Sequence, residues 1–182
     1  QAATYAYDAN NNRIQVSDKR GNSTHLAYDD RGNTTIITNT VGDVTRMTYD
    51  AGNNLLTQTD AISHTTVYTY DVRSNLIQRS DARGGLVTWS YDASGQPISS
   101  RDANGNLTTY TYDVNGNQTG STNALGHVTS STYDTVGRKL TETDALGRVT
   151  TYTYDAANRL LTVAEPLGKV TAFGYDAVGN RT

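Results

Sequence analysis

Apolar and aromatic side chains recur along the chain with a period of 21 residues. Each unit opens with a Tyr-Asp pair, and no insertion or deletion interrupts the series. The nine opening tyrosines are Tyr7, Tyr28, Tyr49, Tyr70, Tyr91, Tyr112, Tyr133, Tyr154 and Tyr175. A fixed period of this length is typical of a repeat array, in which each unit contacts chiefly its neighbours.

Within one unit, two runs rich in Thr, Val and Tyr alternate with short polar segments. The runs at 138–143 and 148–154 are examples, and this composition favours strands. Strands joined by tight turns form an antiparallel meander. The sequence therefore predicts an all-β fold without helices, a repeat array of antiparallel β-hairpins with two strands per 21-residue repeat.

Each unit carries two turn signals, in which an Asp precedes a Gly by three residues. Asp favours the first position of a type I turn, and Gly supplies the left-handed conformation of a G1-bulge hairpin. Ser63 and Ser74 replace this Gly, and we expect looser turns there. The turn residues that we assign as structurally important are Asp8, Gly32, Gly42, Asp60, Gly105, Gly126, Gly147 and Gly168.

All 13 Tyr, the Trp and the Phe occupy just two positions of the unit. Nine are the opening tyrosines, which we expect to form a structural ladder. The other six lie two residues earlier: Tyr5, Tyr68, Trp89, Tyr110, Tyr152 and Phe173. Residues two apart on a strand share a face, so the pattern predicts an aromatic ladder on one face of the sheet. Val44, Val128, Val149 and Val170 fall on the opposite face.

Composition limits the function classes. Hydrophobic residues make up 35% of the chain, below the usual roughly 45–50%, which argues against a thick central core. The net charge is −3 with mixed signs, and no basic patch indicates nucleic acid. There are no cysteines for disulfides or thiolate metal sites, and no apolar run approaches the ~20 residues of a membrane-spanning helix.

The whole chain, residues 1–182, reads as one repeat array of about 8.7 units. It begins and ends inside a unit, so we expect a fragment of a longer chain whose remaining repeats are its partners. Free edge strands at its ends would favour end-to-end self-association.

The Tyr-Asp-x-x-Gly-Asn-x-Leu unit, followed by Asp-Ala-x-Gly-x-Val-Thr-x-Tyr, resembles the YD repeat of the Rhs family. That family includes bacterial Rhs polymorphic toxins, the B and C components of insecticidal toxin complexes, and teneurin-like ectodomains. The resemblance covers the whole chain. It implies a strip of hairpins that spirals into a hollow β-shell, which in bacterial members encloses a C-terminal toxin domain. It also implies a secreted or cell-surface protein, with a bacterial source favoured.

Three features of the sequence are candidates for a chemical site. The segments 102–106 and 113–117 are rich in Asp, Asn and Gly but lack the Gly and Glu spacing of a calcium-binding EF-hand loop, and turn geometry explains them. The family's protease region carries an Asp-Pro-x-Gly-Leu type motif, whereas Glu165 to Gly168 has Glu in place of Asp and occupies an ordinary turn position. His25, His64 and His127 lie in different units. We therefore predict no catalytic residue, no metal site and no cofactor.

The preferred interpretation is a non-catalytic segment of a shell wall around a toxin domain. The first alternative is an adhesion or carbohydrate-binding module, because exposed aromatic rings can stack on sugars, and Trp89 is the candidate glycan contact. The second alternative is a self-associating β-filament segment.

Overall fold

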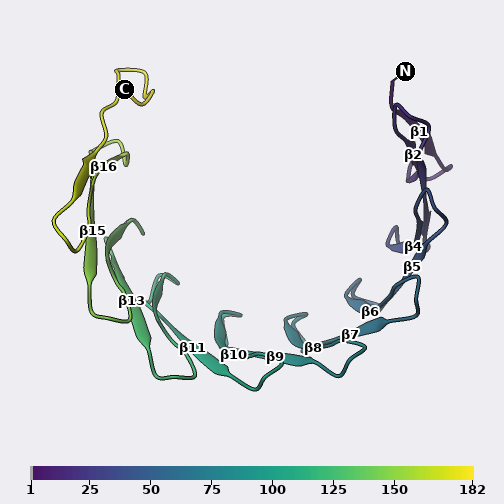
Figure 1. Ribbon diagram of the computed structural model, residues 1–182, viewed down its shortest axis with the longest axis horizontal. Coiled ribbons are helices and arrows are strands. Elements are labelled where there is room, and N and C mark those ends of the chain that lie inside the picture. The colour runs from purple at the N-terminus through teal and green to yellow at the C-terminus, as the bar shows by residue number, and fades with distance from the viewer. Residues whose placement is uncertain (1) are drawn as a thin grey trace. The chain divides into compact units, whose positions relative to one another are not determined.

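The computed structural model describes residues 2–182, which form strands and turns. Those residues contain 17 strands and no helix, so the predicted all-β fold is confirmed. No membrane-crossing helix, long and apolar enough for that role, occurs among them. Figure 1 shows the strands following one another as hairpins joined by tight turns.

The chain divides into two compact units, and each is described by itself. The first reaches to Trp89 and also includes Asp102–Asn104, and the second comprises Ser90–Arg101 and Gly105–Thr182. Strand β9 (Leu86–Tyr91) lies at their boundary. The other strands of the first unit are β1 (Thr4–Tyr7), β2 (Arg13–Ser17), β3 (Ser23–Tyr28), β4 (Thr34–Thr38), β5 (Val44–Tyr49), β6 (Leu55–Thr59), β7 (Thr65–Tyr70) and β8 (Leu76–Ser80).

The second unit continues the same order. Its strands are β10 (Pro97–Arg101), β11 (Leu107–Tyr112), β12 (Gln118–Thr122), β13 (Val128–Tyr133), β14 (Lys139–Thr143), β15 (Val149–Tyr154), β16 (Leu160–Ala164) and β17 (Val170–Ala172). Within each unit, every strand pairs antiparallel with its neighbours in the sequence, for example β2 with β3 and β14 with β15. The strands predicted at 138–143 and 148–154 each begin one residue later than expected. Arg138 and Arg148 still belong to the turns, where their carbonyls accept the N–H groups of Asp134 and Asp144.

The two turns of a repeat produce different pairing. Across the first turn, β15 and β16 pair from Thr151↔Ala164 to Tyr154↔Leu160, with a register shift before Tyr154. Across the second turn, β14 and β15 pair over only three positions, from Thr141↔Thr151 to Thr143↔Val149. The backbones of β14 and β15 are therefore not paired with each other near their first-turn ends, although each strand still pairs there with its other neighbour.

The tight turns follow from the Asp residues and the positive-φ residues. In the turn at 113–117, Asp113 Oδ1 accepts the backbone N–H groups of Asn115 and Asn117, both at 2.9 Å. Gly116 has φ +86°, as a G1-bulge turn requires, and its N–H donates to the Asp113 carbonyl at 3.1 Å. The turns with serine close equally well, since Ser63 and Ser74 donate to their aspartate carbonyls at 3.0 Å. The expectation of looser turns at these serines is therefore wrong.

The two faces of the sheet differ in side-chain type. Along β15, Tyr152 and Tyr154 are half-buried, whereas Val149, Thr151 and Thr153 on the other face are exposed. Hydroxyls on the exposed face pair across strands at 2.6–2.7 Å, in the pairs Thr48–Thr57, Ser90–Ser99, Thr132–Thr141 and Thr153–Thr162. No residue among 2–182 is fully buried, so the described chain has no central core, as its composition predicts.

Candidate functional site

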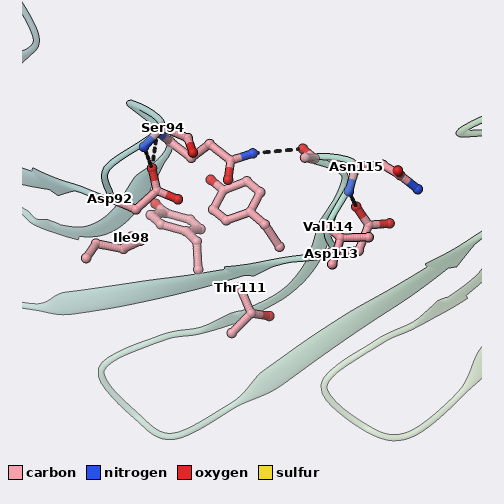
Figure 2. Close-up of a pocket in the computed structure, with 11 residues that line it drawn as sticks. Asp92, Ser94, Ile98, Thr111, Asp113, Val114 and Asn115 are labelled. Carbon is pink, nitrogen blue, oxygen red and sulfur yellow. Dashed lines mark hydrogen bonds between the residues drawn. The ribbon is translucent and has the colours of Figure 1, made fainter.

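An open groove of the second unit lies between two successive first turns, at 92–96 and 113–116. It is open to solvent and has a volume of about 740 Å³. Figure 2 shows Asp92 and Ser94 on one side and Asp113, Val114 and Asn115 on the other. The two turns position these side chains because each Asp organises the backbone that follows it.

The aspartate carboxylates of this groove accept hydrogen bonds from within their own turns. Asp92 Oδ1 accepts the N–H groups of Ser94 at 2.8 Å and Gln96 at 2.9 Å. Asp113 Oδ2 accepts Asn117 Nδ2 at 2.9 Å. That side-chain bond is the largest cause that lowers the pKa of Asp113 below its ordinary value. A carboxylate held ionised in this way is a poor general acid.

The tyrosine hydroxyls of the groove are also engaged. Tyr112 Oη donates to the Pro97 carbonyl at 2.8 Å, and burial raises the pKa of Tyr112. Tyr110 Oη lies 3.0 Å from Ser100 Oγ. Across the groove, Gln96 Nε2 donates to the Gly116 carbonyl at 3.2 Å (Figure 2). The groove is thus assembled from groups that bond to one another, and this arrangement favours a structural role.

The Tyr112 bond is one of six of its kind in the described residues, in each of which the opening tyrosine of a unit donates to the carbonyl 15 residues earlier. In each case the acceptor carbonyl belongs to the first residue of the even-numbered strand that precedes the tyrosine in the chain. It lies at the end where backbone pairing between these two neighbouring segments has stopped. The bonds are Tyr28–Arg13, Tyr49–Thr34, Tyr112–Pro97, Tyr133–Gln118, Tyr154–Lys139 and Tyr175–Leu160, at 2.8–3.0 Å. The hydroxyl therefore closes the opening that the short pairing across the second turn leaves between the two strands.

A second groove, of about 540 Å³, lies in the first unit between the second turns at 60–64 and 81–85. His64 Nδ1 is 3.3 Å from Asp60 Oδ2. Asp81 Oδ1 accepts the N–H groups of Arg83 and Gly85, at 2.9 and 2.8 Å. Gly85 stands where most other second turns carry a side-chain donor, so Asp81 Oδ2 lacks the bond that Asp18 receives from Asn22 at 2.8 Å.

The described residues bear on the metal and protease motifs considered in the sequence. Residues 2–182 contain no cluster of three or more His, Asp or Glu side chains that could hold a metal ion. The segment from Glu165 to Gly168 is an ordinary second turn, because Gly168 N–H donates to the Glu165 carbonyl at 2.9 Å and Gly168 has φ +82°.

The residues assigned from the sequence fall into three groups. The opening tyrosines up to Tyr154 each end a strand, and Tyr175 forms an isolated bridge with Arg181. The assigned turn glycines have positive φ: Gly32, Gly42, Gly105, Gly126, Gly147 and Gly168. Trp89 is half-buried and does not line either groove described above, and its contact with a glycan stays a prediction. Sequence reasoning missed Gln96, whose turn position gave no sign of a bond to the next turn.

The family model described as RHS Repeat matches six stretches of the chain: 7–44, 28–61, 49–86, 91–128, 133–166 and 154–182. No curated protein matches the chain. Among solved structures, the crystal structure titled TcdB2-TccC3-Cdc42 has 18% identity and a TM-score of 0.64. TcdB2-TccC3 alone has 18% identity and 0.62, and the Photorhabdus luminescens Tc holotoxin pore with the TccC3 mutation D651A has 18% and 0.60. Each match covers 99% of this chain and 12% of the other.

Proposed function

The chain belongs to the RHS repeat family, and we propose that it forms part of the wall of a shell that encloses a toxin domain. In this proposal the segment is non-catalytic, and its partners are further repeats of a longer protein and the enclosed domain. That protein is secreted or displayed at the surface of a bacterial cell.

The observation that carries the proposal is the recurrence of one structural bond in successive repeats. The opening tyrosine fastens neighbouring strands in the same way at Tyr112, Tyr133 and Tyr154. A wall needs this uniformity, whereas a binding or catalytic site would favour one repeat that departs from the others.

The surface of the sheet gives further support. Residues 2–182 bury none of their large apolar side chains completely, and Leu125, Leu146 and Leu167 at three second turns are 77–95% exposed. These leucines occupy the same position in three successive second turns, and apolar side chains that gather into a patch mark a contact surface. Coverage by other parts of a larger assembly would account for them.

The fold likeness to TcdB2-TccC3 supports the same class of assembly. At 18% identity it shows the fold alone, and the chain spans about 12% of the length of that structure. Enclosure and the nature of the enclosed domain are therefore parts of the proposal.

Small-angle scattering and electron microscopy on the longest parent chain test the proposal. We expect a compact particle with a low-density centre. A downstream domain should also resist added protease until the shell is opened. A rod, or a particle that lengthens with concentration, would overturn enclosure and favour adhesion or self-association.

A further inference from the structure

Successive first turns are tied to each other through two positions of the repeat. The corner residue is the one with positive φ, such as Asn53 (φ 66°) or Ser74 (φ 64°). The linking residue follows it directly, such as Asn54. The linking residue bonds back to the aspartate of its own turn, as Asn54 Nδ2 does to Asp50 Oδ2 at 2.9 Å.

Where the next corner has a side-chain oxygen, the linking residue also donates to it across a separation of 20 residues. Asn33 Nδ2 donates to Asn53 Oδ1 at 2.8 Å, and Asn54 Nδ2 donates to Ser74 Oγ at 3.0 Å. In the second unit, Arg138 donates from one terminal guanidinium nitrogen to Asn158 Oδ1 at 2.8 Å.

Where the next corner is glycine, only a longer linking residue reaches the next turn. Gln96 Nε2 donates to the Gly116 carbonyl at 3.2 Å. A Cβ at Gly116 would lie 2.9 Å from Gln96 Nε2, so a side chain at that corner would displace the Gln96 amide from its present position. Arg159 precedes the corner Gly179 and donates to the Asp176 carbonyl at 3.3 Å.

Short linking residues before a glycine corner remain within their own turn. Asn117 Nδ2 donates to Asp113 Oδ2 at 2.9 Å, and Asn12 Nδ2 donates to Asp8 Oδ2 at 3.0 Å. Within the described residues, neither side chain donates to the next turn, whose corners are Gly137 and Gly32.

We propose that the linking residue and the following corner residue form a recognition pair that fixes each first turn to the next. This pairing explains the non-glycine residues at Asn53, Ser74 and Asn158. An L-residue with φ near +65° is strained, and the bond from the preceding turn offsets that strain. Asn12–Gly32 and Asn117–Gly137 are then unlinked junctions at which neighbouring turns separate more easily.

The first test removes one link. Ser74→Ala keeps the backbone strain and deletes the acceptor of Asn54. Ser63→Ala is the matched control, because Ser63 has φ 67° and its side chain has no hydrogen-bond partner among the described residues. We expect hydrogen exchange of the turn amides around Ser74 to rise about fivefold, the factor for one ordinary hydrogen bond. Exchange around Ser63 should change less than twofold, and equal changes at both turns would overturn the pairing.

The second test builds a link. Gly137→Asn places a side-chain oxygen at the corner after Asn117, where a Cβ would lie 3.4 Å from Asn117 Oδ1. Gly147→Asn is the control, since its φ of 77° is similar and nothing lies within 4 Å of its Cβ. We expect a smaller loss of melting temperature for Gly137→Asn and a shifted Asn117 side-chain amide resonance. Equal losses with an unshifted resonance would contradict the proposal.

Discussion

The hydroxyl of Tyr112 donates a 2.8 Å hydrogen bond to the backbone carbonyl of Pro97, 15 residues earlier. Pro97 begins β10 and has no N–H for pairing, yet its carbonyl is used to fasten β11 to β10. The bond acts where backbone pairing between the two strands has ended, since their register runs only from Ser99↔Thr109 to Arg101↔Leu107.

Replacing Tyr112 by Phe should lower the free energy of unfolding by about 1 kcal/mol. The substitution deletes the hydroxyl and leaves the Pro97 carbonyl without this donor, while the ring is kept. Tyr7→Phe is the control, because Tyr7 is 53% exposed and its hydroxyl has no bond among residues 2–182. Urea denaturation of both variants provides the measurement. A Tyr112→Phe protein as stable as the parent would show that the bond has no net value.

A side chain at Gly85 should stabilise the second turn at 81–85. Asn at this position can donate to Asp81 Oδ2, as Asn22 does to Asp18 Oδ2. The added Cβ would lie 2.5 Å from Asp81 Oδ2, which is the flexible end of a side chain and can move. We expect Gly85→Asn to raise stability by about 0.5–1 kcal/mol, from the new bond and the reduced freedom of the unfolded chain.

The neighbouring glycine provides the control for this substitution. Gly84 has φ +83°, a conformation that an L-residue adopts only with strain. Gly84→Asn should therefore lower the melting temperature while Gly85→Asn raises it. If both variants melt below the parent, the missing side-chain hydrogen bond to Asp81 Oδ2 does not limit the stability of this turn.

The strands and turns could be predicted from the sequence because their causes are local. Asp113 and Gly116 lie three residues apart, and the turn follows from the Asp113 carboxylate, which accepts backbone N–H groups, and from the positive φ of Gly116. The contacts between repeats were missed because each partner already had a sufficient local explanation. From the sequence alone Ser74 is only a weak substitute for glycine, whereas in the structure its hydroxyl accepts a hydrogen bond from Asn54, 20 residues earlier. Such pairs are hard to recognise in a repetitive sequence, because similar residues occur at the same positions of every unit.

Acid should destabilise the chain through its turn aspartates. Side-chain bonds from Asn22, Asn54 and Asn117 are the largest causes that lower the pKa values of Asp18, Asp50 and Asp113. Because these folded-state values lie below the ordinary 3.8, the stabilisation is complete well above pH 3.8. It is lost as the pH falls through the lowered pKa values. Circular dichroism during acid titration should show a stable sheet at pH 5 to 7 and unfolding below about pH 4.

One substitution separates titration from turn geometry. Asn39 already occupies the aspartate position of a second turn, where its Oδ1 accepts the N–H groups of Val41 and Asp43 at 3.0 and 2.9 Å. Asp18→Asn should therefore keep its turn at neutral pH and shift the acid midpoint to lower pH. An acid midpoint that moves upward would contradict the assignment of Asp18 as a contributor.

Arg138 should be replaceable by Asn but not by Ala. Its Nε donates to Asp134 Oδ2 at 2.6 Å, and its guanidinium also reaches Asn158 and lies 4.9 Å from the centre of the Tyr154 ring. Asn33 occupies the equivalent position of an earlier repeat. Its Nδ2 donates both to Asp29 Oδ2 in its own turn and to Asn53 Oδ1 in the next turn. We expect Arg138→Asn to change stability by less than about 0.5 kcal/mol and Arg138→Ala to cost about 1–2 kcal/mol.

Arg148 is the matched control for the last prediction. It forms the same bond within its own turn, with Nε 2.6 Å from Asp144 Oδ2, but its side chain is 57% exposed and makes no other bond in the described residues. Exposed ion pairs of this kind contribute little, so Arg148→Ala should cost less than about 0.5 kcal/mol. Thermal melts of the two alanine variants therefore separate the contribution of the ion pair within the turn from that of the contacts with the next repeat. If they melt together, the ion pair within the turn accounts for the whole effect, and the contacts of Arg138 with the next repeat contribute nothing to stability.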